Sequence, residues 1–236
     1  MDARRLQYLK ALDIDVWRRR EGAEPIAAAT LATVAPIATA TTPQPAAATL
    51  DWTSLESAVR GCTLCELSKT RTQTVFGVGD RAAQWMVIGE APGADEDREG
   101  EPFVGRAGQL LTSMLKAMGL KREQVFIANI LKCRPPGNRD PKPEEVAQCM
   151  PYLEQQIERV NPRLILCVGR IAAQNLLKTD TPIGKLRGQL HRLPGTERPV
   201  VVTYHPAYLL RSPGEKRKAW ADLVFAMNTA EGLATA

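Results

Sequence analysis

The amino-acid sequence lacks any apolar run near the ~20 residues that a membrane-spanning helix needs. No signal peptide is visible at the charged N-terminus, so we expect a cytoplasmic protein without membrane contact. Aromatic residues form 5% of the chain and histidine occurs twice, whereas charged residues form 24%. This composition is typical of a soluble globular protein, and 236 residues suffice for one or two domains with a buried core.

A strong imbalance of charge is also absent. Lys and Arg number 31 against 26 Asp and Glu, which gives a formal net charge of +5. Such a mildly basic chain is compatible with a polyanionic partner but does not establish one. The five cysteines indicate reduced thiols or a metal site, because disulfides are rare in the cytoplasm.

Two segments precede the predicted folded domain. Residues 1–20 carry Leu6, Leu9 and Leu12 on one stripe between basic flanks, which predicts a short amphipathic helix. Ala, Thr and Pro dominate residues 21–50, and this composition buries too little apolar surface to offset its ordering entropy. We therefore predict a disordered linker there. The folded domain is predicted over residues 51–236, beginning with a helix that Asp51 or Thr53 caps.

Short apolar runs alternate with helical patterns in this domain. The runs are Trp85–Ile88, Val125–Ile130, Leu164–Val168 and Val200–Thr203. The helical patterns are Val104–Met118, Glu144–Val160, Ile171–Leu177 and Glu215–Thr229. Alternation of this kind predicts an α/β fold in which helices cover both faces of a parallel sheet.

Polar residues follow three of these runs. Glu90 lies within Gly89-Glu90-Ala91-Pro92-Gly93, where regular structure must break. Asn129 lies at the end of the second run, and His205 follows the fourth. Each has an ordinary structural explanation, as a turn acid, a strand-end amide or one of two histidines. Because the carboxyl ends of parallel strands meet at one edge of a sheet, the three together predict a site.

Four of the cysteines form a plausible metal site. Cys62 and Cys65 form a Cys-x-x-Cys, Cys133 follows the second run, and Cys149 lies in the next helical pattern. Zinc and an iron–sulfur cluster both accept four thiolates, and spacing alone does not choose between them. Cys167 lies inside an apolar run and is most simply a core residue. Redox catalysis by the Cys-x-x-Cys is a weaker alternative, because it lacks a thioredoxin-like context.

Several motifs, taken in order, resemble those of one enzyme family. They are Gly89-Glu90-Ala91-Pro92-Gly93, Pro102-Phe103-Val104-Gly105, Asn129, Cys133-Arg134-Pro135-Pro136-Gly137-Asn138-Arg139 and His205-Pro206-Ala207. In this combination the chain is similar to the family 4 uracil-DNA glycosylases, the iron–sulfur members of their superfamily. The resemblance implies an αβα sandwich on a four-stranded parallel sheet and excision of uracil from DNA. It also implies a [4Fe-4S] cluster on Cys62, Cys65, Cys133 and Cys149.

The resemblance also implies roles for the residues around the base. Uracil would leave the duplex and enter a pocket that Gly89 and Ala91 help to form. Phe103 would offer an aromatic face to the base; the lesser alternative is a core residue under the loop. The Asn129 amide can accept from uracil N3–H and donate to O4, whereas cytosine presents the opposite pattern. His205 would donate a hydrogen bond to uracil O2 as the base departs.

Three acids are candidates for holding the attacking water. Glu90 is the first choice, and Glu96 and Asp97 are near enough in sequence to be alternatives. Glu96 could instead crowd the C5 position of the base and exclude the methyl group of thymine. A covalent-trapping relative of the family carries an insert rich in Arg and His. No histidine occurs in residues 1–190, so that variant is excluded.

Basic residues are expected to contact DNA phosphates without reading sequence. The candidates flank the second and fourth runs and are Lys132, Arg134, Arg139, Arg187, Arg211, Lys216 and Arg217. Leu209 and Leu210 follow His205. They are either a wedge that enters the vacated base stack or core residues of the last helix.

An alternative function is a non-catalytic nucleic-acid-binding or polymerase-accessory module with a structural metal. The presence of Glu90, Asn129 and His205 favours catalysis. We expect a monomer that acts on single- or double-stranded DNA. Residues 1–20 resemble the opening peptide of a clamp-loader psi subunit, which implies that they dock on a replication or repair partner. Packing of this segment onto its own domain is the alternative.

Overall fold

The computed structural model describes residues 51–234. The predicted helix of residues 1–20 and linker of residues 21–50 lie outside the described residues. The described part begins with α2 (Trp52–Arg60), and its N-cap is Asp51, whose carboxylate accepts the backbone N–H of Ser54 at 2.7 Å. This cap confirms the prediction for the start of the first helix of the domain. Within the described part, no helix combines the length and hydropathy needed to cross a membrane.

The described residues contain a six-stranded sheet in the order β1-β3-β2-β4-β6-β5. Its four central strands are parallel and coincide with the four predicted runs: β2 (Trp85–Gly89), β3 (Phe126–Asn129), β4 (Leu164–Val168) and β6 (Pro199–Thr203). The predicted count of four strands is wrong, because β1 (Val78–Gly79) and β5 (Leu190–Arg192) pair antiparallel at the two edges. Strands this short show no usable periodicity in the sequence.

Helices fill the connections between the strands. Those that pack on the sheet are α4 (Arg106–Ala117), α5 (Pro143–Val160), α6 (Arg170–Leu177) and α9 (Lys216–Ala234), and they match the predicted helical patterns. Shorter helices are α3 (Ala94–Glu99), α7 (Ile183–Leu186) and α8 (Pro206–Arg211). Single 3₁₀ turns occupy Glu66–Lys69, Arg122–Gln124, Pro136–Asn138 and Pro213–Glu215.

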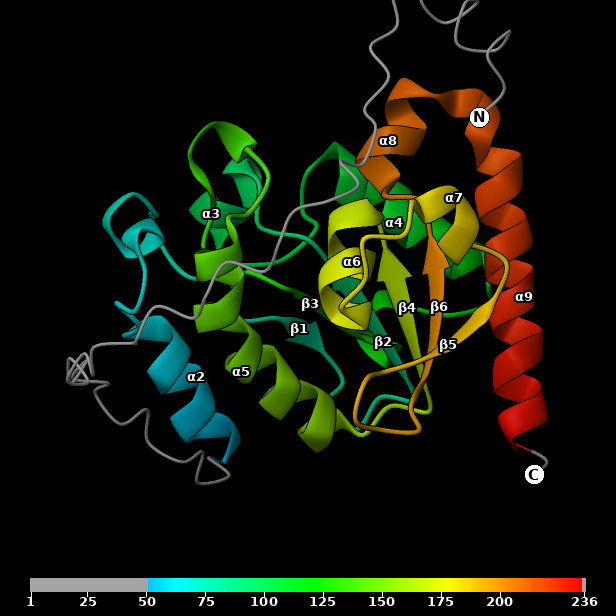
Figure 1. The fold of residues 1–236 in the computed structure, drawn as a ribbon, viewed down its shortest axis with the longest axis horizontal. Helices are drawn as coiled ribbons and strands as arrows, with labels where there is room; N and C mark the ends of the chain where they lie inside the picture. The colour runs from blue at the N-terminus through cyan, green and yellow to red at the C-terminus, as the bar shows by residue number, and fades with distance from the viewer. Residues whose placement is uncertain (1–50, 235–236) are drawn as a thin grey trace, which may run out of the picture. The chain divides into compact units, whose positions relative to one another are not determined.

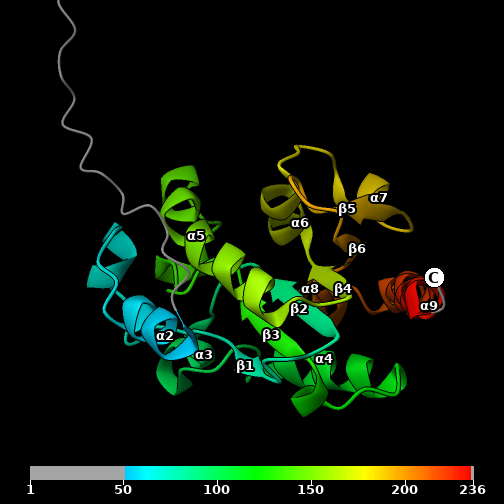
Figure 2. The same ribbon diagram turned by 90° about the horizontal axis from the view of Figure 1, so that it is seen from below.

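Alternation along the strands divides the core into two layers. Met86 and Ile88 pack in one buried cluster with side chains of α5 and α6, whereas Val87 packs in another with side chains of α4 and α9. Successive side chains of a strand point to opposite faces of the sheet, so each face acquires its own helices. Figure 2 shows α5 and α6 on one side of the sheet and α4 on the other. The predicted αβα layering is therefore confirmed.

The parallel register brings the strand ends level at one edge. Gly89 pairs with Asn129, and Val168 pairs with Thr203. Beyond β2, the carbonyl of Glu90 accepts the N–H of Leu131 at 3.0 Å, which holds the Glu90 backbone beside the segment after β3. In Figure 1, β4 and β6 point toward the end of the molecule where α8 lies.

A buried ion pair joins the residue after α7 to α9, and a hydrogen bond joins α9 to the end of β6. Arg187 donates from Nε and Nη2 to the Asp222 carboxylate at 2.7 and 3.0 Å, and the Thr203 hydroxyl donates to the same carboxylate at 2.8 Å. The guanidinium also lies 4.0 Å from the ring centroid of Tyr204. With 11% of its side chain exposed and Nε and Nη2 both bound to Asp222, Arg187 is a structural residue. Its predicted role as a phosphate contact is wrong.

We expect Asp222→Ala to lower the free energy of unfolding by about 3–5 kcal/mol, because it leaves the buried Arg187 guanidinium without its carboxylate. Urea unfolding followed by circular dichroism measures this change. Glu197→Ala breaks an exposed pair with Arg192 and is the control, with an expected loss below about 1 kcal/mol. Equal losses in the two variants would show that the buried pair does not stabilise the fold.

Candidate active site

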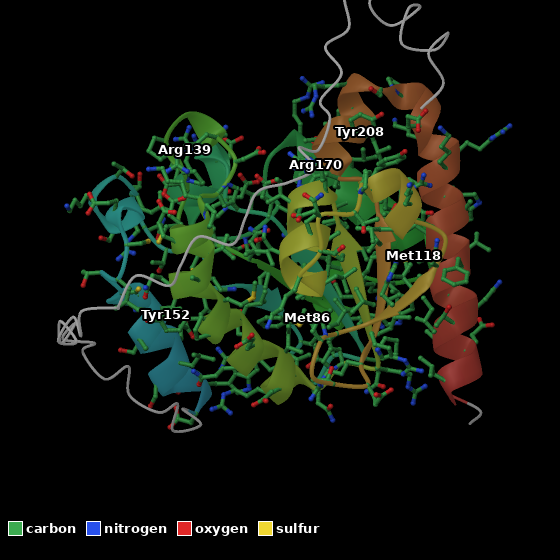
Figure 3. The ribbon with its side chains drawn as sticks, in the orientation of Figure 1. Met86, Met118, Arg139, Tyr152, Arg170 and Tyr208 are labelled. Carbon is green, nitrogen blue, oxygen red and sulfur yellow. The ribbon has the colours of Figure 1, made fainter. Side chains whose placement is uncertain are left out.

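A cavity of about 530 Å³ opens at the carboxyl edge of the parallel strands. Glu90, Asn129 and His205 all line it, so the prediction that these three residues meet in one crevice is confirmed. The remaining walls come mainly from the loops after β2 and β3 and from α8, and they include Ala91, Pro92, Glu96, Phe103, Arg106, Asn138, Arg139, Asp140, Ala207 and Arg211. Figure 3 shows Arg139 and Arg170 at this end of the sheet.

Gly89 provides the space in which two of the site residues lie. A β-carbon at this position would come within 2.4 Å of Asn129 Oδ1 and 2.6 Å of the Phe103 ring. Both separations are far below van der Waals contact, so any side chain at position 89 would displace these two residues. Gly89 therefore shapes the site without lining the cavity itself.

Asn129 presents an unsatisfied acceptor. Asn129 is 2% exposed, and its side-chain Oδ1 has no hydrogen-bond partner within residues 51–234. Leaving a buried acceptor without a donor costs about 1–3 kcal/mol. A ligand N–H that reaches this oxygen would remove that cost.

Phe103 is both a core residue and a wall of the cavity. It is 6% exposed and packs in the same buried cluster as the side chains of α4 and α9. Its ring centroid lies 5.7 Å from that of His205, with an interplanar angle of 31°. The backbone has φ 56°, an uncommon value for a bulky residue. Gly108 makes this conformation possible, because a β-carbon there would lie 1.7 Å from the Phe103 carbonyl oxygen.

His205 is the N-cap of α8. Its Nδ1 accepts the backbone N–H of Ala207 at 3.1 Å, so in the neutral ring the proton is on Nε2. Burial, with a smaller contribution from the nearby Arg211, lowers the pKa of His205 from 6.5 to about 4. The imidazole is therefore neutral near pH 7, and Nε2 is its hydrogen-bond donor.

Glu90 changes its charge near neutral pH. The pKa of Glu90 is raised from 4.5 to about 7, mainly by burial and also by the charge of Asp140, whereas the charge of Arg170 acts to lower it. Asp140 and Arg170 are themselves paired, with Nη2 2.8 Å from Oδ2. A carboxyl with a pKa near the working pH suits a general base.

The other two candidate acids are engaged with the backbone. Glu96 accepts three backbone N–H groups from the surrounding loops, at 3.0 to 3.3 Å. Asp97 accepts the N–H of Thr72 at 3.0 Å and is 4% exposed. These contacts hold α3 against its neighbouring loops. Glu90 makes no such side-chain hydrogen bond within residues 51–234, and the geometry therefore favours Glu90 as the acid that holds water.

The arginines near the cavity include one that the sequence reasoning missed. Arg139 and Arg211 line the cavity, and Arg139 is also paired with Glu145; their contact with DNA phosphates stays a prediction. Arg134 donates to Asn138 Oδ1 at 2.8 Å in the adjoining loop. Arg106, the first residue of α4, is exposed and lines the cavity as well. Arg106 lies between Gly105 and Ala107 with no basic residue beside it, so no cluster of positive charge in the sequence indicates a role for it.

Two residues predicted to contact DNA are buried instead. Lys132 is 1% exposed, and its Nζ donates to Asn129 O and Gln156 Oε1. Leu209 is also 1% exposed and packs with α9 in the core. A phosphate contact by Lys132 and a wedge role for Leu209 are therefore wrong, because neither side chain reaches the surface. Leu210 is partly exposed, and its role stays a prediction.

A second cavity lies against Cys62, Cys65, Cys133 and Cys149. Arg71 donates to Cys133 Sγ at 3.1 Å, and the backbone N–H of Lys132 donates to Cys149 Sγ at 3.2 Å. Burial raises the pKa of the Cys149 thiol to about 12 and that of the Cys133 thiol above its usual range, so these two sulfurs need a cationic group to exist as thiolates. Cys167 is fully buried in β4, which confirms it as a core residue.

The strand order and the polar residues at the carboxyl edge define an α/β protein with one ligand crevice at its strand ends. Residues 76–224 match the family model described as the uracil DNA glycosylase superfamily. That class agrees with the resemblance seen in the motifs.

Individual relatives narrow the class. The chain is 49% identical over 178 residues to a type-4 uracil-DNA glycosylase of Archaeoglobus fulgidus, which covers 72% of this chain and 89% of that protein. It is 42% identical over 180 residues to the type-4 uracil-DNA glycosylase of Pyrobaculum aerophilum, an alignment that covers 74% of this chain and 92% of that protein. A type-5 enzyme of the same organism is 33% identical over 148 residues, or 56% and 64% of the two chains. The chain belongs to the type-4 uracil-DNA glycosylases.

We expect Asp140 and Arg170 to shift the pKa of Glu90 in opposite directions. Asp140→Asn removes a negative charge and should lower the pKa of Glu90, whereas Arg170→Ala removes a positive charge and should raise it. Carbon-13 NMR titration of the Glu90 carboxyl measures both shifts against the unmodified chain. Shifts of the same sign in both variants would contradict the assigned electrostatics.

Proposed function

We propose that the chain excises uracil from DNA in the cavity at the carboxyl edge of the sheet. Asn129 reads the base, His205 stabilises the leaving group, and Glu90 holds the attacking water. The observation that carries this proposal is the buried Asn129 Oδ1 without a donor. Uracil supplies a donor at N3, whereas cytosine has an acceptor there, so the same oxygen accepts one base and rejects the other.

The base reaches this cavity only after it leaves the duplex, at a cost of a few kcal/mol. The space that Gly89 leaves open and the Phe103 ring beside it suit a flat pyrimidine. Arg106, Arg139 and Arg211 line the same cavity, where phosphates of the strand would position the flipped nucleotide.

Cleavage moves charge toward two groups of the site. The bond between uracil N1 and the sugar C1′ breaks, and its electron pair leaves with uracil, where negative charge gathers on O2. The neutral His205 donates from Nε2 to that oxygen. The Glu90 carboxylate faces the cationic sugar and accepts the proton of the water that attacks C1′. The products are free uracil and an abasic site.

We also propose that Cys62, Cys65, Cys133 and Cys149 hold a [4Fe-4S] cluster. Four thiolates are the ligand set of such a cluster, and all four sulfurs border one cavity. When bound, the cluster would cross-link the segment after α2, the segment after β3 and helix α5.

Two further features of the proposal concern the surroundings of the enzyme. Residues 1–20 would dock on a replication or repair partner, and the chain would act as a monomer. Both stay predictions, and residues 1–20 lie outside the described part of the chain. A non-catalytic DNA-binding module is the competing function, and it predicts binding without an abasic product.

The functional test is incubation of the full-length protein with an oligonucleotide that carries one uracil. We expect an alkali-sensitive abasic site at that position. His205→Ala should lower the single-turnover rate by ~10²–10³-fold, because it removes the donor to O2. His191→Ala, the change at the other histidine, is the control and should keep the rate.

The two parts of the proposal fail differently in this experiment. The absence of an abasic site with the unmodified chain would refute uracil excision. Excision by His205→Ala at the unmodified rate would refute only the role of His205.

For the cluster, we expect Cys133→Ser to abolish stoichiometric iron and sulfide, since it removes one of four ligands. Cys167→Ser is the matched control and should keep both, because Cys167 is buried in β4 and does not line the cavity of the other four cysteines. Metal analysis of the purified variants makes the comparison. Stoichiometric zinc without iron in the unmodified chain would overturn the assignment.

A further inference from the structure

Lys132 is a buried cation between the two sites. It is 1% exposed, and its Nζ donates to the backbone oxygen of Asn129 at 2.9 Å and to Gln156 Oε1 at 2.6 Å. Both partners are neutral. None of the ion pairs within residues 51–234 includes Lys132.

A buried ammonium of this kind needs a negative group nearby. Its desolvation costs several kcal/mol, which two neutral acceptors do not offset. Lys132 itself lines the cavity of the four cysteines, and its backbone N–H contacts Cys149 Sγ. Thiolates in that cavity would supply the missing negative charge. This step rests on the proposed function of the four cysteines as ligands.

The other end of Lys132 reaches the base-reading residue. Asn129 O, which Nζ contacts, belongs to the same residue whose side-chain Oδ1 is unsatisfied in the active-site cavity. Gln156 is 0% exposed and donates from Nε2 to Phe76 O at 2.9 Å, which orients Oε1 toward Lys132. The ammonium is thus held from two sides against the Asn129 backbone.

We propose that Lys132 is a positioning residue that links the four-cysteine site to the orientation of Asn129. It does not contact the base. Its Nζ, held between Asn129 O and Gln156 Oε1, fixes the backbone from which the Asn129 amide projects, and its own backbone N–H binds Cys149 Sγ at the four-cysteine site. A displacement of about 1 Å of a group that positions the substrate can lower a rate ~10²-fold, so a small displacement of Asn129 would lower the excision rate measurably.

The test compares the full-length protein, purified with its iron, with Lys132→Met, which keeps the length and apolar stem but removes the charge. We expect the single-turnover rate of uracil excision to fall ~10–100-fold, the range found when a residue that orients a functional group is removed. Affinity for the same DNA should change less than about 3-fold, because the exposed arginines that meet phosphate are untouched. Iron should also pass to a chelator faster than from the unmodified protein.

Leu153→Ala is the control for a purely structural effect. Leu153 is fully buried on α5, the helix of Gln156, and forms part of the core without a polar contact to Lys132. Its truncation should lower the melting temperature as a core cavity does. At a temperature well below melting, its excision rate and iron release should equal those of the unmodified chain.

The outcomes separate the link from the function it rests on. A rate loss in Lys132→Met with near-normal DNA affinity and faster iron release, absent in Leu153→Ala, supports the link. Excision by Lys132→Met at the unmodified rate, or equal losses in both variants, overturns it while leaving uracil excision intact. An unmodified chain without iron or without excision overturns the proposed function and the link with it. If Lys132→Met is insoluble, Lys132→Gln, which keeps a donor without charge, is judged by the same criteria.

Discussion

The register of the four parallel strands is the constraint on which the site depends. Gly89 is paired with Asn129 and Val168 with Thr203, so the residues that follow them emerge at one level of one edge. A slip of one residue in β3 would turn Asn129 to the opposite face of the sheet, away from Phe103 and Glu90. The core fixes this register, because alternate side chains of each strand belong to two different buried clusters.

Burial then sets the chemistry of the residues at that edge. It raises the pKa of Glu90 to about 7 and lowers that of His205 to about 4, so one acid is poised near neutrality and the imidazole stays neutral. The same exclusion of water leaves Asn129 Oδ1 without a partner and Lys132 without a carboxylate. Such a site favours the ligand that donates to Asn129 Oδ1, or the cluster whose negative charge offsets the Lys132 ammonium, because each supplies a partner that water does not.

Much of this arrangement could be predicted from the sequence, for a physical reason. The central strands are buried on both faces, so they appear as continuous apolar runs, and the polar residues after them mark the carboxyl edge. Burial of individual polar residues could not be predicted in the same way. Arg187 has its partner Asp222 35 residues along the chain, and Lys132 finds Gln156 24 residues away. The edge strands β1 and β5 exist only through pairing with β3 and β6.

The central claim is that Asn129 recognises uracil through its unsatisfied carbonyl oxygen. NMR titration of the full-length protein with free uracil and with free cytosine, observed at the Asn129 side-chain amide, tests it most directly. The account predicts that uracil shifts the Asn129 amide signals in a saturable way, whereas cytosine at the same concentration leaves them in place. Equal shifts with both bases, or no shift with uracil, would contradict it.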